Sequence, residues 1–173
     1  MKDQIKKLRD LTGFGIIDCK KALEQSKGDL DKAISILKEK GAKILEQKST
    51  RKAKEGVIEA YIHFSQKMGS MVEVNCETDF VARNEEFRKF AKDIAMQVAA
   101  LEAEYVSKDS VPEELTGKLN TEEKEVFFKN KCLMQQQYVK DNSITIADYL
   151  NTLVAKFKEN INIRRFVRFS LGE

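Results

Sequence analysis

The chain of 173 residues contains no tryptophan, one proline, one histidine and three cysteines. Cys19, Cys76 and Cys132 are far apart and have no C-x-x-C spacing, so they predict reduced thiols that fill apolar space, not a disulfide framework or a metal site. The histidine, His63, has no second histidine beside it and no serine or cysteine in an obvious catalytic arrangement, and is interpreted as a sheet residue. A single proline and only eight glycines favour a helix-rich chain.

Signatures of catalysis and of phosphate binding are also missing. The sequence has no G-x-x-x-x-G-K-[ST], G-x-S-x-G or H-E-x-x-H run. Gly13-Phe14-Gly15 lacks the third glycine and the preceding strand of a dinucleotide fingerprint, which indicates a turn between helices. Adjacent acids such as Glu85 and Glu86 stand at predicted helix starts, where the helix dipole explains them. We therefore expect a protein that is not an enzyme and that needs neither a cofactor nor a metal.

No run approaches the ~18 apolar residues of a membrane span. The first ten residues carry charges too often to contain the apolar core of a signal peptide. The 31 basic residues nearly balance 28 acidic ones, giving a net charge of +3, which makes no strong case for phosphate-backbone binding. These features predict a cytoplasmic protein without membrane or direct nucleic-acid contacts.

The N-terminal part predicts three short amphipathic helices. Gly28 fits the left-handed position after the second helix, and Asp29 can cap the third. The third apolar stripe ends towards Gly41, and residues 42–54 start helical and become a basic, polar linker. We interpret residues 1–54 as one module with its linker, and a solvated linker or helix tail is favoured over a nucleic-acid patch. The apolar positions of the three helices are Ile5, Leu8 and Leu11, then Ile16, Cys19, Ala22 and Leu23, then Leu30, Ala33, Ile34 and Leu37.

Residues 56–76 alternate with the period of two that is typical of strands. One predicted strand ends at Phe64, residues 67–70 turn the chain, and a second strand ends at Cys76. The two should form an antiparallel hairpin. The residues that share a face are Ile58, Ala60, Ile62 and Phe64 in the first strand and Val72, Val74 and Cys76 in the second.

The alternation stops at Thr78, Asp79 and Phe80, and Asn84 can cap a helix that follows. This stretch is therefore a connector between a strand and a helix, at the rim of the sheet. Two interpretations are open from the residues alone. Asp79 and Phe80 are either a turn acid beside a core aromatic, since most phenylalanines are buried, or a surface connector of the kind that carries function.

The remainder of the chain predicts further helices and one more strand. A helix runs from Asn84 to Leu101, another starts at Thr121, and a capping box at Thr145–Asp148 starts a third. The terminal strand carries Ile161, Ile163, Val167, Phe169 and Leu171 on one face, interrupted by Arg165. The prediction for the whole chain is an α+β fold, with residues 55–173 forming helices packed on a three-stranded antiparallel sheet.

Three segments resemble one known family. TGFGIIDCKKAL near the start, NCETDFVARN in the middle and ENINIRRFVRF near the end are similar to bacterial elongation factor Ts, in its short form with a single core unit. The resemblance covers nearly the whole chain. It implies a small ubiquitin-associated-like helical module at the N-terminus, a core through which short forms pair as homodimers, and elongation factor Tu as the partner.

The resemblance also implies a function and a site. Members promote nucleotide exchange by pressing the segment equivalent to Thr78, Asp79, Phe80 and Val81 against the partner, where it disturbs the magnesium and phosphate site so that GDP leaves and GTP can bind. It further implies a docking segment at Asp18-Cys19-Lys20-Lys21, with the docking role carried over to Lys20. Solvated lysines are the alternative for this segment.

The sequence departs from the family pattern at two places, and two other functions remain open. Lys158 stands where the family usually has glycine, and Gln135-Gln136-Gln137 replaces the commoner Glu-Gln-Pro. The chain could instead be an adaptor whose module binds another protein, or an RNA-binding translation accessory protein that uses arginines near the sheet. We favour a basic edge that deters strand aggregation, or pairs with acids, for those arginines, which are Arg164, Arg165 and Arg168.

Overall fold

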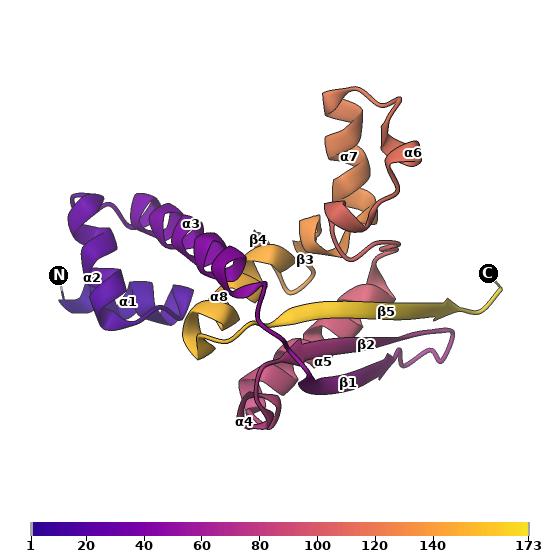
Figure 1. The fold of residues 1–173 in the computed structure, drawn as a ribbon, viewed down its shortest axis with the longest axis horizontal. Helices are drawn as coiled ribbons and strands as arrows, with labels where there is room; N and C mark the ends of the chain where they lie inside the picture. Colours follow the sequence, from indigo (N-terminus) through magenta and orange to yellow (C-terminus); the bar gives the residue numbers. More distant parts are fainter. Residues whose placement is uncertain (1, 173) are drawn as a thin grey trace.

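A computed structural model describes residues 2–172, apart from the side chains of residues 42 and 45. The fold is α+β, as predicted, with the two termini at opposite ends of the molecule (Figure 1). The N-terminal end is built from three helices, α1 (Lys2–Thr12), α2 (Ile16–Gln25) and α3 (Leu30–Lys48). Leu8, Cys19 and Leu37 are fully buried between them.

The predicted turn before α3 and the predicted cap of that helix are confirmed. Gly28 has φ +86°, and Asp29 Oδ1 accepts hydrogen bonds from the Asp31 and Lys32 amides at 3.1 Å, so the turn and the cap are as expected. Helix α3 continues through Gly41 to Lys48, so the predicted helical start of residues 42–54 is confirmed. Gly41 serves close packing, because a Cβ there would lie 3.3 Å from Asn151 Cβ. Ile16, placed by pattern in the helical core, is exposed at the first turn of α2.

The sheet has three antiparallel strands in the order β1 (Glu55–Ile62), β2 (Met68–Cys76) and β5 (Asn162–Ser170), with β2 in the centre. The terminal strand thus joins the hairpin, as predicted. The turn lies at residues 63–67, earlier than expected, because the His63 amide already bonds to the Met68 carbonyl at 2.9 Å. Helix α5 (Glu85–Ala100) packs across all three strands and buries Phe87 and Phe90.

The prediction of a single apolar face along the terminal strand is wrong. Ile163 pairs with Val74 and Arg165 pairs with Glu73, so Arg164 is an extra residue in a β-bulge. One extra residue exchanges the two faces of a strand. Ile161 and Ile163 therefore face the core, whereas Val167, Phe169 and Leu171 are exposed.

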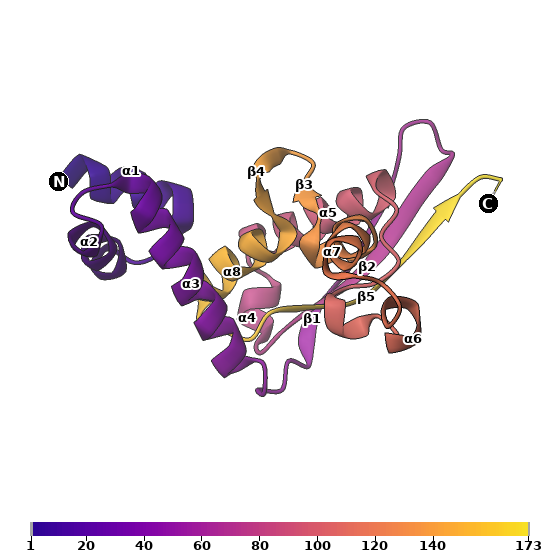
Figure 2. The ribbon, with the colours of Figure 1, turned by 90° about the horizontal axis from the view of Figure 1, so that it is seen from above.

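The segment between α5 and β5 projects from the body and then returns to it (Figures 1 and 2). The cap of α7 is Asn120, one residue before the predicted start, and the predicted capping box of Thr145 with Asp148 is confirmed. The short hairpin β3–β4 was not predicted, because its strands are too short for a periodic pattern. The elements are η1 (Lys108–Ser110), α6 (Glu113–Thr116), α7 (Thr121–Lys131), η2 (Leu133–Gln135), β3 (Gln137–Tyr138), β4 (Asp141–Thr145) and α8 (Ile146–Phe157).

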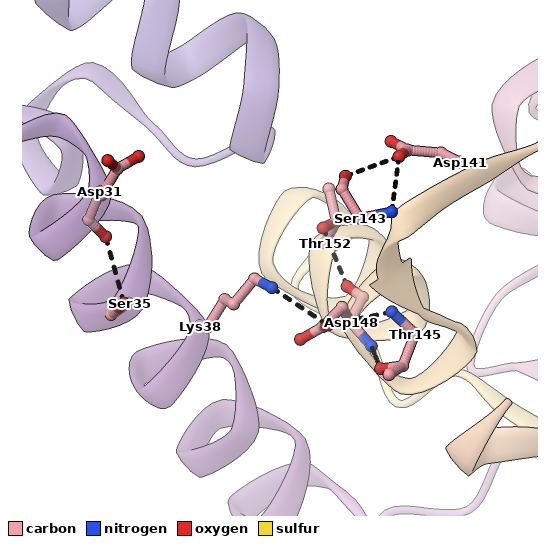
Figure 3. Close-up of polar contacts among 8 residues, drawn as sticks. All are labelled: Asp31, Ser35, Lys38, Asp141, Ser143, Thr145, Asp148 and Thr152. Atoms are coloured by element: carbon pink, nitrogen blue, oxygen red, sulfur yellow. Dashed lines mark hydrogen bonds and ion pairs between the residues drawn. The ribbon is translucent and has the colours of Figure 1, made fainter. Parts of the chain in front are cut away.

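The three N-terminal helices contact the rest of the chain where α3 packs against α8. Lys38 Nζ donates to Asp148 Oδ2 at 3.1 Å, and the same carboxylate accepts the Thr145 amide in the cap of α8 (Figure 3). Ala155 of α8 belongs to the buried cluster of the three N-terminal helices. The contact between α3 and α8 is therefore both apolar and ionic.

Candidate partner-binding site

The predicted connector at residues 78–81 contains one turn of helix, α4 (Asp79–Ala82), between β2 and α5. Thr78 caps this turn, since its Oγ1 accepts a hydrogen bond from the Val81 amide at 3.4 Å. Val81 and Ala82 are buried and anchor the turn on the core. The Phe80 side chain points outward and is 81% exposed. The interpretation of Phe80 as a core aromatic is therefore wrong.

The carboxylate of Asp79 lies in an ion pair beside this ring. Asp79 Oδ2 is 3.0 Å from Arg83 Nη2, one turn further along the chain. Both side chains remain largely accessible, so the pair is weak and can exchange for other partners. The i,i+4 spacing of Arg83 from Asp79 is the sequence signal for this pair, and Arg83 was not among the predicted site residues.

Thr78 is fixed at each of its polar atoms. Its amide donates to Glu159 Oε2 at 3.1 Å and its hydroxyl donates to Glu159 Oε1 at 2.6 Å. The Glu77 amide adds a third bond to the same carboxylate at 3.0 Å. On the other side, the Thr78 carbonyl accepts from Cys76 Sγ at 3.1 Å. Burial raises the pKa of the Cys76 thiol to about 11, which keeps it a neutral donor.

A second set of contacts supports the hydrogen bonds that Glu159 makes to Glu77 and Thr78. The Asn160 amide donates to Glu77 Oε1 at 2.6 Å, and Asn160 Nδ2 donates to the Arg51 carbonyl at 2.7 Å. Arg51 also lies 3.6 Å from Glu77 Oε1. Three distant segments therefore meet beneath the exposed turn. Sequence reasoning missed Glu159 and Asn160, because contacts across 81 or more positions leave no local pattern.

The second predicted segment, Asp18–Lys21, lies on α2, and α2 and α4 lie apart in both views (Figures 1 and 2). Lys20 and Lys21 are exposed, and Lys20 lies 3.8 Å from Glu24. Asp18 is engaged by Lys40. Cys19 is fully buried and its thiol faces the Phe14 carbonyl, so it can support this surface but cannot contact a partner.

The arginines of β5 are engaged within the chain. Arg165 Nε donates to Glu73 Oε2 at 2.7 Å, and Arg164 lies 3.7 Å from the other Glu73 oxygen. The hydrogen bond from Arg165 is the main cause that holds the pKa of Glu73 below its usual range. Arg168 Nε donates to the Ala99 carbonyl at 3.4 Å. These contacts favour a paired sheet edge over an RNA-binding surface.

The residues that the structure describes were compared with the requirements of a metal site and of a membrane-spanning helix, and they meet neither. Among residues 2–172, no group of three or more histidine, cysteine, aspartate or glutamate side chains is placed to hold a metal ion. In the same range, no helix is long and apolar enough to cross a membrane. Phe80 is one of several exposed aromatic rings, and it stands on a turn that Glu159 holds by hydrogen bonds.

The chain combines a helical module, an α+β core and an exposed aromatic ring on a turn that Glu159 holds. Comparison with known proteins defines the family. The family model described as Elongation factor TS matches residues 5–127 and 115–173. The chain therefore belongs to the elongation factor Ts family.

Curated proteins of this family are similar in sequence to this chain along almost its whole length. Elongation factor Ts of Carboxydothermus hydrogenoformans is 48% identical over 98% of this chain and 88% of its own length. The protein of the same name from Thermotoga neapolitana is 45% identical over 99% of this chain and 96% of its own. Elongation factor Ts of Thermodesulfovibrio yellowstonii is 46% identical over 98% of this chain and 94% of its own length.

Proposed function

We propose that this chain is the guanine-nucleotide exchange factor of elongation factor Tu in the cytoplasm. It binds the GDP-bound partner and promotes release of GDP by disturbing the magnesium and phosphate site, so that GTP can bind. It acts by binding and performs no covalent chemistry of its own. The observation that carries this proposal is Phe80, an 81% exposed ring on a turn that the core and Glu159 hold from beneath.

The energetic requirement follows from linkage. If the factor loosens the nucleotide, the nucleotide loosens the factor by the same free energy. Each tenfold loosening requires about 1.4 kcal/mol of differential interaction. Burial of a phenylalanine ring that was exposed supplies about 1.5–3 kcal/mol, which corresponds to one or two factors of ten. The module and the sheet must supply the remainder.

The exposed turn suggests how that energy is used. Phe80 wedges between structural elements of the partner, and Asp79 exchanges part of its contact with Arg83 for polar groups there. Thr78 and Val81 do not need to reach the partner to matter, because they hold the turn from which Phe80 projects. The displaced backbone of the partner then loses its hold on the magnesium ion and the diphosphate.

The N-terminal residues 1–54 are proposed as a docking unit of the ubiquitin-associated type, and residues 55–173 as the core that acts on the nucleotide site. Lys20 and Lys21 supply positive charge on the surface of α2. Leu11, Ile16 and Ile17 are exposed at the ends of α1 and α2 and line the same hollow, which adds an apolar area for a partner. A mixed apolar and basic surface suits a protein better than a polyanion.

The outer face of the sheet is proposed to bind a second copy of the chain. The strand register places Ala60, Met71 and Val167 in one row and Ile62, Gly69 and Phe169 in the next. A Cβ on Gly69 would lie 2.6 Å from Ile62 Cδ1, so glycine lets the isoleucine lie across the central strand. A contiguous exposed apolar face of this kind marks an interface.

Release of labelled GDP from elongation factor Tu tests the proposal. The wild-type chain in excess should accelerate release strongly, and the partner should bind it most firmly without nucleotide. An adaptor would bind some protein without accelerating release, and an RNA-binding protein would lose its ligand steeply with salt. Unaccelerated release with saturating wild-type chain would contradict the proposed function.

A further inference from the structure

The residue that most directly controls the exposed turn lies far from it in the sequence. Helix α8 ends at Phe157, its C-cap residue Lys158 has φ +56°, and the next residue, Glu159, reaches the start of α4. Its carboxylate accepts three hydrogen bonds, from the Glu77 amide, the Thr78 amide and the Thr78 hydroxyl, at 2.6 to 3.1 Å. Hydrogen bonds to an ionised acceptor are the strong ones.

These bonds form a relay to the backbone that carries Phe80. A threonine hydroxyl has one proton and two lone pairs. Because the Thr78 proton is directed to Glu159, a lone pair is left for the Val81 amide, which donates to the same oxygen. The Glu159 carboxylate therefore orients the capping group of α4, and α4 is the element from which Phe80 projects.

Val81 and Ala82 anchor the C-terminal half of the turn on the core, whereas its start at Thr78 is held by the bonds to Glu159. A single helical turn is unstable in isolation, and the exposed Phe80 ring packs on little of the chain. Glu159 is itself fixed, because the neighbouring Asn160 is buried and bonded to Glu77 and Arg51. Without the carboxylate, the turn would sample other conformations, and ordering it against the partner would cost free energy.

We infer that Glu159 is a positioning residue for nucleotide exchange, which holds the turn of Thr78–Val81 so that Phe80 stands in place before the partner arrives. The inference rests on the proposed function and adds a residue to its machinery. This role distinguishes the docking of the factor from the release of GDP. Docking through the N-terminal module does not require the turn, whereas GDP release does.

The test compares Glu159→Ala with Glu123→Ala as a matched control. Glu123 also accepts a backbone amide, that of Asn120 at 2.9 Å, but it does so in the cap of the projecting helix α7. GDP release is measured over a range of factor concentrations. Glu159→Ala should lower the maximal rate by about tenfold, equivalent to about 1.4 kcal/mol, and leave the half-saturating concentration nearly unchanged. Glu123→Ala should keep both values.

Two further measurements separate positioning from a general loss of structure. The Glu77 and Thr78 amides should exchange hydrogen faster in Glu159→Ala, with unchanged far-UV circular dichroism. Thr78→Val removes the hydroxyl alone and should lower the maximal rate by itself. Combined with Glu159→Ala, it should add less than its separate effect, because both changes break one relay.

The outcomes are distinct. Accelerated release by wild type and equally by Glu159→Ala would overturn the inference and leave the proposed function intact. Independent, multiplying effects of Thr78→Val and Glu159→Ala would overturn it as well. If Glu159→Ala does not fold, Thr78→Val with a wild-type maximal rate overturns it. No acceleration by wild type would instead contradict the proposed function.

Discussion

Lys48 Nζ donates a hydrogen bond to the carbonyl oxygen of Lys158, and this bond connects the last residue of α3 to the residue that ends α8. The contact uses the backbone of Lys158, whose side chain is exposed. Lys158 adopts φ +56° and ψ +28°, the left-handed conformation that favours glycine. Glycine would therefore suit the backbone at this position better than the lysine present here.

Lys158→Gly should stabilise the protein by about 0.5–1 kcal/mol, because glycine has no Cβ to strain the left-handed conformation and the bonded carbonyl is retained. Urea unfolding followed by circular dichroism measures the change. Lys156→Gly, inside the right-handed part of α8, is the control and should destabilise by about 1 kcal/mol. A lower unfolding midpoint for Lys158→Gly would show that its side chain contributes more than the strain costs.

Asp93 should make the stability depend on acid pH. Its side chain is buried, which opposes ionisation, but hydrogen bonds from Lys140 and Lys89 outweigh burial and hold its pKa below the usual range. The Tyr149 hydroxyl donates a further hydrogen bond to the same carboxylate at 3.1 Å. A lowered folded-state pKa adds stability above the unfolded value of about 3.9, and this stability is lost as pH falls through the folded value.

Asp93→Asn should accordingly lower the free energy of unfolding by about 2 kcal/mol at pH 7. The decrease should be smaller at pH 3, because the wild-type carboxylate contributes less stability as the pH falls. Urea unfolding of both proteins at the two pH values gives the comparison. Asp109→Asn, an exposed acid, should change stability little at either pH. An unchanged difference between Asp93→Asn and wild type at both pH values would exclude this role.

The sequence predicts those parts of the fold that have a local cause. Asn84 and Thr145 cap helices because their side chains satisfy amides two or three residues away. The bulge at Arg164 has no such signal, since one extra residue leaves the apolar composition of the strand unchanged. The same limit applies to the site. The segment around Phe80 can be found from its motif, but the contact from Glu159 comes from a segment 81 positions away.

The outer face of the sheet should hold two copies of the chain together. Sedimentation equilibrium at micromolar concentration should show a dimer for wild type and a monomer for Phe169→Lys, because a lysine in the centre of an apolar interface is desolvated without a partner. Leu115→Lys, on the projecting α6, should stay dimeric. A monomeric wild type, or a Phe169→Lys protein that remains dimeric, would contradict the pairing through this face.

The lysines of α2 should affect docking without affecting the release step. Lys20→Ala/Lys21→Ala should raise the half-saturating concentration of the factor several-fold at low salt and less at high salt, because exposed charges are screened. The maximal rate of GDP release should stay unchanged. Lys6→Ala/Lys7→Ala removes an exposed pair from α1 and is the matched control. Equal effects of the two double variants would indicate general electrostatic attraction and no specific docking by α2.

Release of labelled GDP from elongation factor Tu by Asp79→Ala/Phe80→Ala tests the central claim most directly. Phe64→Ala, which removes an exposed ring from the turn between β1 and β2, is the control. The account predicts strong acceleration by wild type and by Phe64→Ala, and at least about tenfold less by Asp79→Ala/Phe80→Ala, in line with the loss of one buried ring. All three chains should have the same circular dichroism. Equal acceleration by all three would contradict a role for the exposed turn in nucleotide release.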